Sequence, residues 1–198
     1  MKRIVFIVIV LLLITGCSIN YKEYNDIDNY SNYLISLRDN TDAHSYLSIF
    51  PDEIVNNNVE EFRYLSEDGL FDGDYLFYLV VNYDKESFYN EKDRISNITI
   101  NYKNLEKKIL YSEEGFNYPV YISIFDNNGS FEYALADEEN YKIIYIFNQF
   151  FMWDKIEINK NYEPIDYKVP IKDIKREGYN MYYFFNKNGD GIMFNETY

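Results

Sequence analysis

The chain contains few of the residues on which most catalytic and metal sites depend. Among its 198 residues there are one cysteine, one histidine and one tryptophan. A single cysteine excludes an internal disulfide, and a single histidine excludes the multi-histidine zinc sites of hydrolases. Ser45 follows His44 directly, whereas a nucleophile and its base must face each other across a site. No phosphate loop, G-x-S-x-G or H-E-x-x-H motif is present, so we expect a non-enzymatic protein without a cofactor.

The N-terminus has the pattern of a secretory signal peptide. Lys2 and Arg3 precede a run of eleven apolar residues, 4–14, and small residues follow it. The run is too short to cross a bilayer core of about 30 Å as a helix. Residues 14–17, with the sequence I-T-G-C, resemble the lipobox of bacterial lipoproteins. This resemblance implies that the chain is cut before Cys17 and that a diacylglyceryl group, with acyl chains such as palmitate, is attached to its thiol.

The lipobox therefore predicts both the domain organisation of the chain and its location in the cell. We expect residues 1–16 to be a lipoprotein signal peptide, residues 17–26 a lipidated tether, and residues 27–198 a single folded domain. The chain has only three alanines and is rich in residues with AT-rich codons, such as Asn, Ile, Tyr and Phe. This bias is typical of a low-GC Gram-positive host. The predicted location is the extracellular face of the cytoplasmic membrane.

The charge balance limits the partners of the predicted mature protein. Without Lys2 and Arg3, 17 basic residues remain against 33 acidic ones, which gives a net charge of about −16. This charge excludes nucleic acid as a partner, because phosphate contacts need a basic surface. It also opposes flat binding of the domain to anionic lipid. We therefore expect the acyl group to be the membrane link, with the body of the protein held off the surface.

Hydrophobic periodicity predicts a single α+β domain. Four apolar residues in 28–39 recur at i, i+3, i+4 and i+7, as in an amphipathic helix, and Asp84 can cap a second helix over 85–95. The Asn128–Gly129 pair is typical of a hairpin turn. We expect a largely antiparallel, meander-like sheet of about six or seven strands with one or two packed helices. The segments with strand patterns are 59–66, 75–83, 98–102, 118–125, 130–136, 141–151, 179–185 and 192–195.

Two groups of acidic and amide residues are weak candidates for a metal site. Asn186, Asn188 and Asp190 match positions 1, 3 and 5 of an EF-hand calcium loop, but Thr197 stands at position 12 and predicted strands flank the loop. Turn formation explains these residues better, so we expect no metal there. The acidic turns at 68–74 and 137–139 would form a cation site only if they met at one end of the sheet.

The densest apolar cluster, residues 147–153, ends with the single tryptophan, Trp153. Inside the fold these side chains are simply core, which is the interpretation we favour. If they are exposed, Trp153 becomes a candidate for stacking against a sugar or for binding a partner. A glycoside hydrolase needs two carboxylates at a defined separation. The chain has 33 acidic residues, and its sequence does not identify which two would form such a pair.

A set of residues in the first half resembles a group of small lipoproteins and exported proteins of Firmicutes. The set comprises residues 48–54, 61–64 and 75–84 together with Phe88, Glu91 and Arg94. In that group a loop containing Phe-Pro, an aromatic strand, an apolar strand and a helix with Phe, Glu and Arg follow in this order. The resemblance covers roughly residues 45–100. It implies a hairpin followed by a helix, and it implies no catalytic residue.

These observations lead to one functional hypothesis and two alternatives. The first is a lipid-anchored, non-enzymatic module that binds another envelope or exported protein, for instance an immunity-type protein that neutralises a basic exported toxin. The second is a module that binds cell-wall glycan or a small ligand through Trp153 and exposed tyrosines. The third is a carboxylate-dependent envelope hydrolase, which would need a cleft with two acids of unequal pKa.

Overall fold

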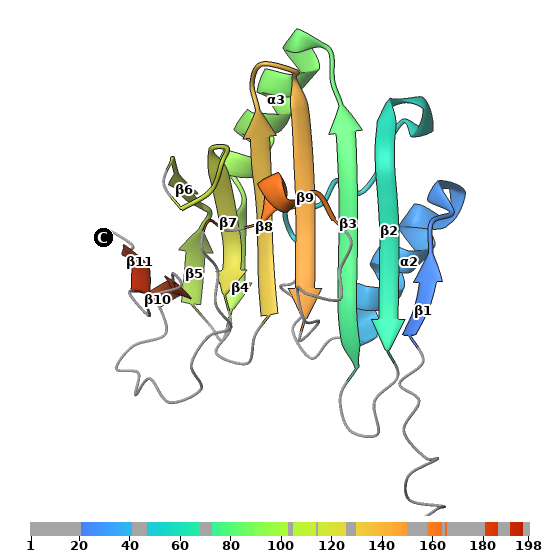
Figure 1. The fold of residues 1–198 in the computed structure, drawn as a ribbon, viewed down its shortest axis with the longest axis horizontal. Coiled ribbons are helices and arrows are strands. Elements are labelled where there is room, and N and C mark those ends of the chain that lie inside the picture. The colour runs from blue at the N-terminus through green and yellow to red at the C-terminus, as the bar shows by residue number, and fades with distance from the viewer. Residues whose placement is uncertain are drawn as a thin grey trace, which may run out of the picture.

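Seven strands form one antiparallel sheet in the order β1-β2-β3-β9-β8-β7-β6 (Figure 1). The computed structural model describes residues 21–40, 47–67, 73–102, 105–113, 115–125, 130–149, 158–163, 165, 181–185 and 191–195. The strands of this sheet are β1 (Tyr21–Tyr24), β2 (Val59–Glu67), β3 (Asp74–Asn82), β6 (Leu110–Ser112), β7 (Val120–Phe125), β8 (Ser130–Asp137) and β9 (Lys142–Gln149). Two smaller sheets pair β4 (Thr99–Tyr102) with β5 (Leu105–Lys108), and β10 (Met181–Phe185) with β11 (Gly191–Asn195). The predicted α+β fold with a largely antiparallel sheet is confirmed.

The main sheet consists of two meanders that meet at its centre. One contains β1, β2 and β3, and the other contains β6, β7, β8 and β9. They join where β3 pairs antiparallel with β9, with Phe77 opposite Phe147. The chain between the two meanders carries α3 (Lys85–Ser96) and the small sheet of β4 and β5. Each meander is local in sequence, and only the pairing of β3 with β9 makes them one sheet.

The fold begins earlier than the sequence predicted. Residues 21–24, which we expected to lie within the tether, form the edge strand β1, with Tyr21 opposite Glu67 of β2. Three of the four side chains in β1 are exposed and the fourth is half-buried, so the segment has no apolar alternation that would predict a strand. Its strand conformation depends on hydrogen bonds to β2. The described fold therefore starts only four residues after Cys17.

Two α-helices lie on the same face of the sheet (Figure 1). The 3₁₀ helix η1 (Ile27–Asn29) leads into α2 (Tyr30–Asn40), which buries Tyr30, Leu34 and Leu37. Helix α3 begins as predicted, because the Asp84 side chain accepts a hydrogen bond from the backbone N–H of Ser87 at 2.9 Å. Two further 3₁₀ turns are η2 (Asn56–Asn58) and η4 (Lys160–Tyr162). None of the helices that the structure describes is both long enough and apolar enough to span a membrane.

Both faces of the sheet carry a hydrophobic core, which explains the continuous apolar run of β3. Alternate residues of β3 belong to the two cores: Phe77 faces the helices, and Tyr78 faces the other side. On the face without α-helices, Phe116, Ile158 and Tyr162 pack against the sheet, and η4 lies over β8 and β9 (Figure 1). A strand buried on both faces needs apolar side chains at every position. The prediction for residues 75–83 is thus confirmed.

Aromatic rings dominate the core on the helical face. Four rings surround Phe77, with centroid distances of 5.5 Å for Tyr30, 5.2 Å for Phe50, 5.3 Å for Phe62 and 5.7 Å for Tyr64. The rings meet in tilted and edge-to-face arrangements, which suit the aromatic quadrupole. These rings come from α2, the loop after it, and β2, so Phe77 connects all three to the centre of the sheet.

We expect the substitution Phe77→Ala to lower the free energy of unfolding by about 3–5 kcal/mol, because it leaves a cavity where four rings meet. Urea denaturation followed by tyrosine fluorescence or circular dichroism measures this change. The matched control is Ile35→Ala on the exposed side of α2, where 55 % of the side chain is accessible and a change within about 0.5 kcal/mol is expected. Equal effects of the two substitutions would contradict this account of the core.

Candidate functional site

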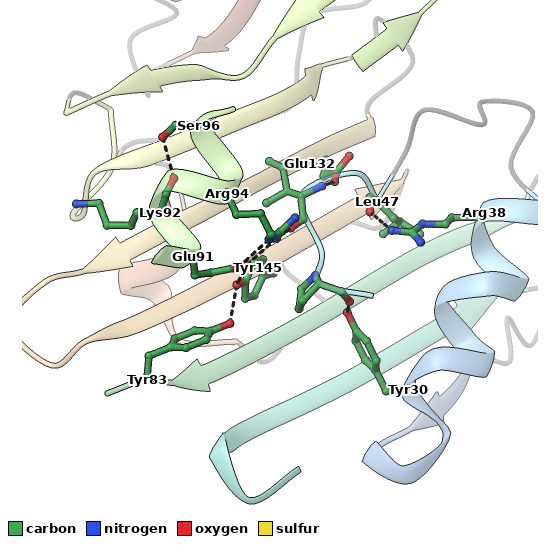
Figure 2. A network of polar contacts seen from close by, with 12 residues as sticks. Tyr30, Arg38, Leu47, Tyr83, Glu91, Lys92, Arg94, Ser96, Glu132 and Tyr145 are labelled. Carbon is green, nitrogen blue, oxygen red and sulfur yellow. Dashed lines mark hydrogen bonds and ion pairs between the residues drawn. The ribbon is translucent and has the colours of Figure 1, made fainter. Parts of the chain in front are cut away.

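The segment Leu47–Asp52 crosses the helical face of the sheet between α2 and α3 (Figure 2). Leu47, Ile49, Phe50 and Pro51 are buried, and the first three belong to the helical-face core. A loop that runs through a core takes its backbone N–H and C=O groups out of water, and each buried group needs a hydrogen-bond partner. The segment is neither helix nor strand, and side chains of neighbouring elements supply several of these bonds.

Three side chains from the two helices bind carbonyl groups of this segment. Arg38 of α2 donates from Nη2 to the Leu47 carbonyl at 2.7 Å, and the Tyr30 hydroxyl donates to the Pro51 carbonyl at 2.7 Å. Arg94 of α3 donates from Nη2 to the Ile49 carbonyl at 2.5 Å. Figure 2 shows the segment held between these groups. Both helices are therefore fixed to the same buried loop.

The N–H groups of the segment bind a single buried carboxylate, Glu132 of β8. The Ile49 N–H donates to Glu132 Oε1 at 2.7 Å, and the Leu47 N–H also donates to this carboxylate. The Ser123 hydroxyl of β7 donates to Oε2 at 3.0 Å. Leu47 has a φ of 62°, a left-handed conformation that residues other than glycine seldom adopt. These hydrogen bonds hold the chain in that conformation.

Burial changes the ionisation of Glu132. Because 1 % of its surface is exposed, desolvation raises its pKa to about 7, although the N–H groups and the Ser123 hydroxyl oppose this effect. Arg38 acts on it at longer range and lowers the pKa. Both oxygens of the carboxyl group accept hydrogen bonds inside the core, Oε1 from the Ile49 N–H and Oε2 from the Ser123 hydroxyl.

A second part of the network extends from Arg94 toward the end of the sheet. Arg94 forms two hydrogen bonds to Glu91, Nε to Oε2 at 2.7 Å and Nη2 to Oε1 at 2.6 Å. Burial has the largest single effect on the pKa of Arg94 and lowers it. The hydrogen bonds and the charge of Glu91, together with Tyr145 and Tyr83, outweigh this effect and raise the pKa, so the guanidinium stays charged. The Tyr145 hydroxyl donates to Glu91 Oε1 at 2.6 Å and lies 2.9 Å from the Tyr83 hydroxyl. Burial raises the pKa of Tyr145 well above its ordinary value, so this tyrosine stays protonated.

Most candidate residues from the sequence analysis lie in parts of the chain that the structure does not describe. Cys17, Trp153, Asn186, Asn188 and Asp190 lie outside the described residues, as do Asp68 and Asp72 of one acidic turn. Phe147 is core, as we favoured for its cluster.

The described parts of the two acidic turns lie at opposite ends of the sheet. Asp74 opens β3 beside Glu67, whereas Asp137 closes β8 beside Lys142, which is the partner of Asn82 at the far end of β3. The eight residue steps of β3 separate these ends by about 26 Å. Among the described residues no group of three or more His, Cys, Asp or Glu side chains is placed to hold a metal ion. A shared cation site that joins Asp74 to the turn at 137–139 is thus ruled out by the register.

Sequence reasoning missed Glu132, although its surroundings contain a signal. Glu132, Ala134 and Ala136 share the helical face of β8. The chain contains only three alanines, and two of them are in this group. Small buried side chains beside a carboxylate in an apolar strand indicate that another part of the chain packs closely there. They do not identify that part, because the hydrogen bond to Ile49 joins residues 83 positions apart.

The substitution Glu132→Gln tests the buried carboxyl group. In the unfolded chain a Glu has a pKa near 4.3, and in the fold Glu132 has a pKa of about 7. The wild type therefore loses stability as the pH rises from about 4.3 to 7, because folding then requires the uptake of a proton. The Gln variant does not lose stability in this way, because its side chain does not ionise. Urea denaturation at pH 4.5 and pH 8 should show the variant gaining up to about 3 kcal/mol relative to the wild type over this range.

Glu60→Gln is a control for which the expected change of stability with pH has the opposite sign. The hydrogen bond from Lys142 lowers the pKa of Glu60, so this carboxylate stabilises the fold above its unfolded pKa and loses its effect as the pH falls. The Glu60 variant should therefore lose stability relative to the wild type as the pH rises. A pH profile of Glu132→Gln that runs parallel to that of the wild type would contradict the raised pKa.

No family model, curated protein or solved structure matches this chain. The resemblance of residues 45–100 to small exported proteins of Firmicutes stays a prediction. The residues that carry it do lie together in the fold. Ile49 and Phe50 pack beside Phe77 and Phe88 in one core. Arg94 binds the buried loop at the Ile49 carbonyl, and Glu91 accepts hydrogen bonds from Arg94.

Proposed function

We propose that this protein is a lipid-anchored envelope protein that binds a basic protein partner through its acidic surface. The observation that carries the proposal is the charge: the whole chain has a net charge of −14, and the predicted mature chain has a charge of about −16. A charge of this size raises the rate of association with a basic partner and opposes association with acidic ones.

Ion pairing in the fold leaves this acidic excess unneutralised. Five basic side chains of the described residues are each paired with a carboxylate at 4 Å or less: Arg38–Asp52, Arg63–Glu23, Lys92–Glu138, Arg94–Glu91 and Lys142–Glu60. Each of these cations is thus already balanced by its own partner. The surplus carboxylates remain available to an incoming cationic surface.

The buried network favours binding over hydrolysis. Glu132 has the perturbed pKa expected of a general acid, but its oxygens are occupied by Leu47, Ile49 and Ser123 inside the core. What the network supplies instead is rigidity, since it fixes α2 and α3 to the sheet. A rigid surface loses little conformational entropy when it binds a partner.

The predicted anchor lies close to one corner of the fold. Four residue steps separate Cys17 from Tyr21, the first residue of β1, and an extended chain of that length spans about 14 Å at most. With an acylated Cys17 at the membrane surface, this corner of the sheet stays within that distance of the lipid. The tether is thus shorter than the ten residues that the sequence predicted.

Cys17→Ala should abolish lipid attachment. In the native host, metabolic labelling with an alkyne-bearing palmitate analogue should label the wild type and the control variant Ser18→Ala, and should leave Cys17→Ala unlabelled. Membrane fractionation should likewise retain the first two and release the third. Equal labelling of all three proteins would refute acylation at Cys17.

Cross-linking in cells with the full-length protein should recover one exported or envelope protein with a basic surface, and the recovery should depend on Cys17. The association rate of the two purified proteins should fall at least about tenfold between 50 mM and 500 mM salt, because screening removes electrostatic steering. A rate independent of salt would argue against charge-driven binding. Recovery of wall fragments alone would favour the glycan-binding alternative.

A further inference from the structure

Aromatic and acidic side chains gather where α3 meets the edge of the sheet formed by β6 and β7. The group consists of Tyr89, Lys92, Tyr111, Glu113, Tyr121 and Glu138, and is called the α3–β6 patch. Tyr89 and Tyr111 are two of the most exposed large apolar side chains described, with 43 % and 47 % of their surface accessible. Exposed tyrosines carry much of the binding energy in protein interfaces.

The geometry of helix and strand brings these residues together. Tyr89 and Lys92 are three residues apart on α3 and therefore share a face of the helix. Tyr111 of β6 is directly opposite Tyr121 of β7, with ring centroids 5.1 Å apart. Tyr121 is buried in the same core cluster as Phe88 and Ile95 of α3, which joins the helix to the strand pair.

The patch is held in place before any partner arrives. The Tyr111 hydroxyl donates to Glu113 Oε1 at 2.9 Å, and Lys92 is paired with Glu138 of the turn between β8 and β9. Side chains fixed in this way lose little rotamer freedom on binding. The patch thus has the rigid aromatic character of an interface anchor.

The chemistry of the patch suits an arginine-bearing partner. Lys92 already lies 5.5 Å from the ring centroids of both Phe88 and Tyr89, so these rings accept a cation within the protein itself. The patch has two glutamates and one lysine, so its own charge is negative. An arginine side chain combines a planar cation that stacks on tyrosine with a fork of donors for a carboxylate.

The position of the patch also leaves it accessible in an anchored protein. Tyr21 lies at one edge of the sheet and at the end where β2 finishes, whereas Tyr111 lies at the other edge, level with Ala134 near the middle of β8. Figure 1 shows β1 and β6 on opposite sides of the sheet. Six strand spacings separate these edges by about 29 Å. The patch is therefore on the edge of the sheet opposite the predicted anchor.

We propose that the α3–β6 patch is the surface that docks an arginine-bearing segment of the basic partner protein. The inference rests on the proposed function and deepens it, because it names the contact surface and the chemistry of the segment. The guanidinium groups stack on Tyr89 and Tyr111 and pair with Glu113. The anchored corner at Tyr21 remains directed toward the membrane.

The test uses the full-length acylated protein in phosphatidylcholine vesicles, with a fluorescent octa-arginine peptide as the probe. Fluorescence anisotropy gives the dissociation constant. The double variant Tyr89→Ser with Tyr111→Ser should raise it by about tenfold or more, because two aromatic anchors are lost. Tyr21→Ser, at the exposed tyrosine of the other edge, should change it by less than about twofold. The double variant with Phe at both positions should bind like the wild type, because the ring faces remain.

The outcomes separate this inference from the proposed function. Salt-dependent binding by the wild type together with equal binding by the double Ser variant would overturn the patch while leaving charge-driven binding intact. A similar loss for Tyr21→Ser would also overturn it, because the binding would then be spread over the surface. A wild type that does not bind octa-arginine would overturn both. Circular dichroism and thermal unfolding of each variant establish that it is folded.

Discussion

The fold depends on one constraint, which is that the backbone of a buried loop must be hydrogen-bonded. Residues 47–52 pass through the core between the two helices and belong to no helix or strand, so their backbone polar groups need other partners. Arg38, Arg94, Tyr30 and Glu132 supply the missing partners. An unpaired buried N–H or C=O group costs about 1–3 kcal/mol, so several such groups together rival the whole stability of a domain. The orientation of both helices on the sheet follows from this requirement.

The same constraint explains why the most perturbed carboxyl group of the described chain is structural. Glu132 has the burial and the raised pKa that often mark an active site, but its hydrogen bonds go to backbone N–H groups and to Ser123. The part of the molecule open to partners is instead the surface, where acidic residues predominate. In the proposed function, the rigid core maintains the shape of the molecule and the acidic surface binds the partner.

An element of the fold can be predicted from the sequence when the residues that define it lie within one short stretch of the chain. The helix over 85–96 has its cap, Asp84, and its buried residues Phe88 and Ile95 within one short stretch, so the sequence predicts it well. The strand β1 has no comparable pattern, because an exposed edge strand is defined by its neighbour and not by its own side chains. The contact between Ile49 and Glu132 has no local signal, apart from the small residues around the glutamate.

Local patterns in the chain account for a signal-peptide pattern ending at Cys17, an acidic composition, two amphipathic helices and a set of apolar strands. Their periodicities are fixed within a few residues by backbone geometry. Three results follow from the tertiary structure alone. Ile49 hydrogen-bonds to Glu132, Tyr111 is paired with Tyr121 beside α3, and Asp74 and Asp137 lie at opposite ends of one sheet. These results depend on strand order and register, which arise from the packing of distant segments, and no short stretch of sequence contains that information.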